Sequence, residues 1–205
     1  ELDTNHIIEK VRQLSLLTEL HTLTNSEICE RLGIDLVTFE ENFQSREILI
    51  EYILKRERES FEQIFLENDF TESNAIDILF IVSREIFKRY SMVKPLVNES
   101  YREVYSNVFQ THMEDRMNYI FEKIKINLDK GIRQGMYRSD LSIELVARLY
   151  ISRLIDIHKP EFFPPEQFSF QMLFEVMFEN FVRSVGTLDG IRYFELRKAE
   201  TTFLL

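Results

Sequence analysis

The sequence predicts an all-α protein, and three observations support this class. Apolar residues recur at intervals of three and four along almost the whole chain, which is the spacing of amphipathic helices. No segment shows the period-two alternation of apolar and polar residues that a half-buried strand needs. The 205 residues include only five glycines and four prolines, too few for the many turns of a β-sandwich or barrel.

Nine helices are expected, with a short tenth near the end of the chain. Residues 45–67 show the pattern best, because Ile50, Ile53 and Phe61 fall on one broad stripe and Ser45 is a suitable N-cap. Short loops rich in Asn, Ser, Gly or Pro separate the segments. The expected ranges are 6–18, 25–31, 36–42, 46–67, 72–92, 97–108, 112–134, 142–157 and 167–185, with the tenth at 188–199.

Residues 24–42 carry the most specific signal. Thr24 and Glu27 have the spacing of a capping box, which opens a first short helix. Gly33 follows, where the chain can turn through positive φ, and Asp35 is placed to cap a second short helix. Two short helices joined by a tight glycine turn make a helix-turn-helix candidate, although the same residues also fit any small helical hairpin.

The surroundings of this pair form a longer pattern. Its members are Ile28-Cys29, Gly33-Ile34-Asp35, Thr38-Phe39, Phe43, Ser45-Arg46 and Leu49, preceded by Ile7, Ile8, Val11 and Leu14. This pattern resembles the N-terminal domain of the tetracycline-repressor (TetR) family, and residues 28–49 match it in order with no insertion or deletion. Residues 131–141 resemble that family's lead-in to its penultimate long helix, and residues 181–190 resemble the end of its last helix.

The resemblance implies a subunit of two helical parts. Residues 1–45 would form a three-helix helix-turn-helix domain, and residues 46–205 a connecting helix and a bundle for ligand binding and dimerisation. Such proteins act as homodimers on palindromic operator DNA in the bacterial cytoplasm and are released by a small molecule. The resemblance implies no catalysis and no cofactor. The residues expected to meet DNA are Thr24, Ser26, Val37, Thr38, Asn42 and Arg46.

The charge of this region departs from the family's pattern. Glu40 and Glu41 stand in the second short helix, where the DNA backbone should approach. Residues 1–50 contain four basic and ten acidic side chains, a net charge of −6, so few cations are present to displace phosphate counterions. Two functions therefore remain open: a regulator that reads DNA through neutral contacts, or a protein whose helix-turn-helix no longer binds DNA and that senses a ligand or binds a partner protein.

The two helices expected at 142–157 and 167–185 are the candidates for a dimer interface. The second is apolar nearly all round, which requires burial on two sides, and two helices from each subunit would form a four-helix interface. The alternative is a central helix of a monomeric core. The predicted interface residues are Leu145, Leu149, Phe170, Phe174, Met177 and Phe181.

Aromatic and methionine side chains between residues 80 and 120 suggest a pocket for a hydrophobic or aromatic effector. The alternative for most of them is ordinary helical core. The predicted pocket residues are Phe87, Tyr90, Tyr101, Tyr105, Phe109, Met113 and Met117.

Other chemistry is absent from the sequence pattern. The single Cys29 excludes an internal disulfide, fits a reducing cytoplasm and is expected to be buried. The four histidines are scattered and are expected at the surface. The charged residues from Lys55 to Glu59 are expected to face solvent. No metal motif, phosphate loop or catalytic triad order occurs, and no apolar run reaches the length of a membrane span, so neither an enzyme nor a membrane partner is expected.

Overall fold

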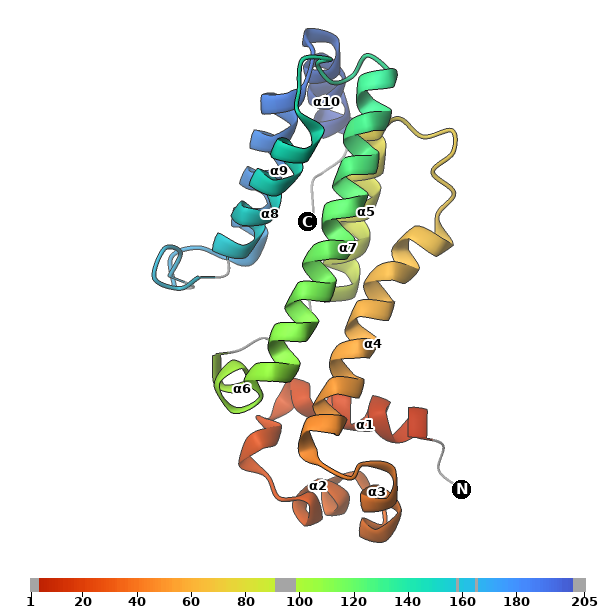
Figure 1. Ribbon diagram of the computed structural model, residues 1–205, viewed down its shortest axis with the longest axis vertical. Coiled ribbons are helices and arrows are strands. Elements are labelled where there is room, and N and C mark those ends of the chain that lie inside the picture. Colours follow the sequence, from red (N-terminus) through yellow and green to blue (C-terminus); the bar gives the residue numbers. More distant parts are fainter. Residues whose placement is uncertain (1–3, 91–98, 158, 165, 201–205) are drawn as a thin grey trace. The chain divides into compact units, whose positions relative to one another are not determined.

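The computed structural model describes residues 4–90, 99–157, 159–164 and 166–200 (Figure 1). These residues form ten α-helices and one 3-10 helix, η1, and no strand occurs among them. The all-α prediction is confirmed. None of the helices in these described ranges is both long and apolar enough to span a membrane. The helices are α1 (Thr4–Leu17), η1 (Leu20–Thr22), α2 (Asn25–Leu32), α3 (Leu36–Asn42), α4 (Arg46–Glu67), α5 (Ala75–Tyr90), α6 (Glu99–Val104), α7 (Ser106–Arg133), α8 (Ile143–Asp156), α9 (Phe170–Val185) and α10 (Leu188–Glu200).

Two helix starts lie three residues later than expected, because a capping side chain sets them. Asn74 accepts the backbone N–H of Asp77 at 2.9 Å, so α5 begins at Ala75 and not at residue 72. Ser169 accepts the N–H of Met172 at 3.2 Å and starts α9 at Phe170. The expected break at 109–111 is wrong, because α7 begins at Ser106 and continues to Arg133.

The chain divides into two compact units. Unit 1 comprises Glu1–Ile64 and Arg89–Arg116, and unit 2 comprises Phe65–Lys88 and Met117–Leu205. The boundary expected at residue 45 therefore falls inside unit 1. The reason is that α4 contributes its first half to the core of that unit.

The core of unit 1 is built by several helices together. Ile7 and Val11 of α1, Ile28 of α2, Phe39 of α3 and Leu49 of α4 are all buried in one cluster. Tyr105, directly before α7, belongs to the same cluster. A helix-turn-helix of only two short helices could not bury enough apolar surface alone, so α1 and α4 are part of its folding unit.

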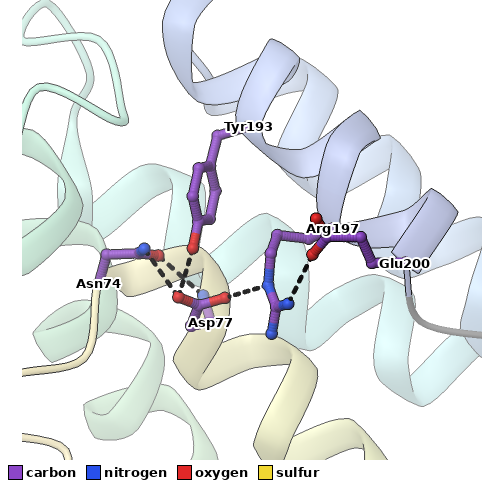
Figure 2. Close-up of polar contacts among 5 residues, drawn as sticks. All are labelled: Asn74, Asp77, Tyr193, Arg197 and Glu200. Atoms are coloured by element: carbon purple, nitrogen blue, oxygen red, sulfur yellow. Dashed lines mark hydrogen bonds and ion pairs between the residues drawn. The ribbon is translucent and has the colours of Figure 1, made fainter.

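A cluster of polar contacts joins the start of α5 to α10 in unit 2 (Figure 2). Asp77 of α5 accepts hydrogen bonds from the Tyr193 hydroxyl at 2.5 Å and from Arg197 Nε at 2.7 Å, which ties α10 to the start of α5 (Figure 2). Gly190 lets the backbones come close, since a Cβ there would lie 2.0 Å from the carbonyl oxygen of Met136. The last helix is thus an integral part of unit 2.

Candidate nucleic-acid interface

The α2–turn–α3 segment has the local geometry of a helix-turn-helix (Figure 1). Thr24 and Glu27 form the predicted capping box, with the Thr24 hydroxyl accepting from the Glu27 N–H and the Glu27 carboxylate accepting from the Thr24 N–H. Gly33 ends α2 in the left-handed conformation with φ of 63°. Asp35 then caps α3 by accepting the Thr38 N–H at 2.9 Å. The sequence therefore dictates this turn residue by residue.

The outward face of α3 is apolar and acidic. Val37 is 62% exposed and Leu36 is 37% exposed, and Glu40 and Glu41 are both exposed one turn further on. Phe39 is buried at 1% exposure, and Cys29 of α2 is buried in the same cluster, where burial raises the pKa of its thiol. The face that would enter a major groove thus presents two carboxylates and no cation.

The side chain of Arg46 makes its hydrogen bonds within unit 1. Its guanidinium donates to the carbonyl oxygens of Leu20 at 3.2 Å and Leu23 at 3.0 Å, and to Oδ1 of Asn25 at 2.7 Å. The side chain therefore clamps the first turn of α4 to the segment that leads into α2. Three of its five N–H donors are used in this way.

Three further candidate DNA contacts also donate inside the unit. The Thr24 hydroxyl donates to Glu27 Oε2 at 2.8 Å, and the Thr38 hydroxyl to Asp35 Oδ2 at 3.2 Å. The Asn42 amide donates to the Thr38 carbonyl at 2.7 Å, and its Oδ1 accepts from the Thr4 hydroxyl at 2.5 Å. A hydroxyl has a single hydrogen to donate, so Thr24 and Thr38 would have to exchange partners to reach a phosphate. Ser26, the sixth candidate, is exposed near the start of α2.

The order of helices and the helix-turn-helix define an all-α protein of the TetR fold. Solved structures of that class superimpose on the chain over most of its length. A TetR-family transcriptional regulator from Agrobacterium tumefaciens matches with a TM-score of 0.67 at 12% identity, over 90% of this chain and 97% of that one. The reduced form of NemR from E. coli gives 0.67 at 14% identity, over 90% and 97%. The ketosteroid transcriptional regulator KstR2 of Mycobacterium tuberculosis gives 0.54 at 17% identity, over 90% and 95%.

At these identities the likeness shows the fold, and the chain has the fold of TetR-family regulators. No protein-family profile matches the sequence, and no curated protein gives a significant match. The helix-turn-helix resemblance inferred from the first fifty residues is thus confirmed at the level of fold.

The predicted dimer residues fall into two groups in unit 2. Leu145 and Leu149 of α8 are exposed, at 56% and 55%, and Phe170 at the start of α9 is exposed as well. The other three, Phe174, Met177 and Phe181, are buried within unit 2 itself, and their role in an interface stays a prediction. Phe181 packs against Tyr150 with ring centroids 5.0 Å apart, and Phe174 packs against Phe87 at 5.3 Å.

The residues that α9 turns outward lie on the neighbouring face. Met172 is exposed and Val176 is 56% exposed, one helical turn apart. The sequence could not separate the two faces, because both are apolar and only the packing of α5, α8 and α10 against α9 decides which is covered.

The predicted pocket residues are shared between the units. Phe87 and Met117 belong to unit 2, and Tyr105, Phe109 and Met113 to unit 1. Tyr105 is a core residue beside the helix-turn-helix and not a free pocket wall. The side chains of Tyr90 and Tyr101 lie outside the described residues. The effector pocket therefore stays a prediction.

A buried polar cluster on α4 and α7 was missed. His112, expected at the surface, is 1% exposed, and Arg58 Nη1 lies 2.9 Å from its Nδ1. Glu57, expected in a solvated run, is also buried, and this burial raises the pKa of its carboxyl. The signal available was weak: Glu57 lies three residues after Leu54 and four before Phe61, on the buried stripe of α4.

Proposed function

We propose that the protein is a transcriptional regulator that binds operator DNA as a homodimer and responds to a small-molecule effector. The observation that carries the proposal is the α2–turn–α3 segment, whose two caps and glycine turn are complete in a chain with the TetR fold. A DNA-binding helix-turn-helix places the second helix of the motif, here α3, in the major groove. Val37 would contact a thymine methyl group, and Ser26 and Thr38 would meet phosphates.

This mode of binding has an electrostatic consequence. An operator-binding domain ordinarily gains affinity by releasing counterions from the phosphates that its lysines and arginines neutralise. Here the outward face of α3 carries Glu40 and Glu41, and Arg46 already donates to three groups inside unit 1. Binding through neutral donors and helix N-termini should therefore depend only weakly on salt.

The test is a mobility-shift titration of the full-length protein on DNA upstream of its own gene at two salt concentrations. Specific binding that changes little between about 50 and 200 mM salt supports the proposal. A Glu40→Lys/Glu41→Lys variant is compared with Glu161→Lys/Glu166→Lys, which makes the same charge change at exposed residues of unit 2. Absence of wild-type binding to any sequence refutes the DNA-binding part.

A second function is favoured by specific contacts. Thr24, Thr38, Asn42 and Arg46 each donate inside the unit, and two carboxylates project from α3. A helix-turn-helix with this arrangement could keep its fold without binding DNA, and the protein would then act as a ligand sensor or a partner for another protein. Affinity that appears only in the Glu40→Lys/Glu41→Lys variant supports this alternative.

The homodimer would form through the outward faces of α8 and α9. Leu145 and Leu149 on α8 and Met172 and Val176 on α9 are large exposed apolar side chains at i,i+4 spacing. Two copies related by a twofold axis would bury these faces as a four-helix arrangement. Sedimentation equilibrium at micromolar concentration should report about twice the chain mass of 24.7 kDa.

Val176→Lys should convert the assembly to monomers, because it would bury an unpaired charge at the interface. The matched control is Leu196→Lys on α10, where an exposed leucine lies outside the proposed face. A wild-type protein that sediments at the mass of one chain contradicts the homodimer.

A further inference from the structure

His112 of α7 is buried in unit 1, and its contacts define which ring nitrogen carries the hydrogen. Arg58 of α4 places Nη1 2.9 Å from Nδ1 of His112. A guanidinium only donates, so Nδ1 accepts and the neutral ring carries its hydrogen on Nε2. Burial, followed by the charges of Arg116 and Arg58, lowers the pKa of His112 to about 3. Near neutral pH, Nε2 is therefore an N–H donor.

That donor and a second one lack an acceptor. Among the residues that the structure describes, neither His112 Nε2 nor Arg116 Nε has a hydrogen-bond partner, and both atoms are buried. The two residues are four apart on α7, so their side chains leave the helix on the same face. Buried N–H groups without an acceptor are rare in folded proteins and call for an explanation.

The chemistry of an acceptor follows from its surroundings. The guanidinium charge of Arg116 acts to lower the pKa of the Glu57 carboxyl, but burial raises that pKa more strongly and favours the neutral carboxyl. Arg58 is shared with Asp115, whose Oδ2 lies 3.7 Å away. A carboxylate supplies two acceptor oxygens and a compensating charge in one group, which a neutral carbonyl does not.

Apolar side chains lie beside these donors on the same helix. The Phe109 ring is buried with its centroid 6.5 Å from that of His112, and Met113 lies one helical turn after Phe109. An acidic group at His112 and Arg116 would therefore be joined to an apolar or aromatic body.

We propose that unit 1 binds a hydrophobic or aromatic carboxylic acid, with the carboxylate accepting hydrogen bonds from His112 Nε2 and Arg116 Nε. The inference rests on the ligand response proposed above and names the chemical class of the effector. Because α4 and α7 both contribute to the cluster, and α4 also carries Arg46, the acid would bind next to the helix that holds the helix-turn-helix segment in unit 1.

The probe is sodium benzoate, with benzyl alcohol as the neutral compound of similar size. The full-length protein, labelled with ¹⁵N-histidine, is titrated with each compound, and the Nε2–H proton of His112 is followed by NMR. Benzoate should move this proton downfield and bind at least about tenfold more tightly than benzyl alcohol, as expected for a charge-assisted hydrogen bond. His112→Phe identifies the signal by its disappearance.

Arg116→Gln should weaken benzoate binding about tenfold or more, and Arg116→Lys, which keeps the charge, should weaken it less. Arg102→Gln, an exposed arginine of unit 1, should leave it unchanged. The inference is overturned if the His112 proton ignores benzoate, if both probes bind equally, or if Arg116→Gln binds benzoate as the wild type does. Equal binding of both probes would refute the preference for a carboxylic acid without refuting the ligand response. None of these measurements requires DNA.

Discussion

Replacing Arg46 by methionine should destabilise unit 1 strongly, whether or not the protein binds DNA. The substitution removes hydrogen bonds to the carbonyls of Leu20 and Leu23 and to Asn25 Oδ1. The Leu20 oxygen still accepts from the Leu23 N–H at 3.1 Å, so two acceptors lose their donor. Hydrogen bonds from a charged donor contribute about 1.5–3 kcal/mol each, and partial exposure lets water replace some of them. We therefore expect a loss of about 2–4 kcal/mol in the free energy of unfolding.

The assay is guanidinium unfolding followed by circular dichroism, with Arg31→Met as the matched control. Arg31 is an exposed arginine on α2 and should change stability by less than about 0.5 kcal/mol. Methionine keeps most of the apolar stem of Arg46, so the comparison isolates the guanidinium. If Arg46→Met unfolds like the wild type but loses operator binding, the arginine serves the phosphate backbone and the clamp described here is wrong.

Three further outcomes follow from buried groups. The pKa of His112 is lowered to about 3 in the folded protein, against about 6.5 in the unfolded chain. The stability that the neutral ring contributes is therefore complete above pH 6.5 and is lost as pH falls toward 3. Between pH 7 and pH 4.5 the free energy of unfolding in urea should fall by about 2–3 kcal/mol more for the wild type than for His112→Gln. Gly190→Ala should cost about 3 kcal/mol or more by thermal unfolding, because its Cβ would lie 2.0 Å from the Met136 oxygen, and Asp189→Ala is the exposed control. Tyr137→Phe should cost about 1–2 kcal/mol in the same measurement, since its buried hydroxyl donates to Asn127 Oδ1 at 3.0 Å; an unchanged melting temperature would contradict that bond.

Local rules were sufficient for most of the fold. The caps at Thr24 and Asp35 and the turn at Gly33 follow from the conformational preferences of those residue types, so the sequence alone predicts the helix-turn-helix. The same rules also place α5 and α9 directly after their caps Asn74 and Ser169, whereas apolar periodicity alone predicts starts three residues earlier.

The candidate sites were less predictable, because they depend on which of two similar faces is covered. Phe174 and Val176 are both apolar residues of α9, yet only Val176 is exposed, and this difference comes from contacts with other helices. His112 likewise looked like a surface residue, because the acidic Glu114 and Asp115 follow it closely. Its ring contacts Arg58, which lies fifty-four positions earlier in the chain, and no local pattern predicts a contact over that distance.

The two readings of the acidic helix α3 differ in a way that the lysine variant can resolve. Lysines at positions 40 and 41 add phosphate contacts, which raise affinity for any DNA sequence alike and steepen the salt dependence by about 2 in the logarithmic slope. They do not supply base contacts. If Glu40→Lys/Glu41→Lys binds the operator better than unrelated DNA, the bases must be read by groups that the wild type already has, such as Val37. If the affinity rises equally for both DNAs, the side chains of Thr24, Thr38 and Asn42 are not available for bases, because they stay bonded to Glu27, Asp35 and the Thr38 carbonyl. Restored charge alone then cannot give the domain specificity for an operator.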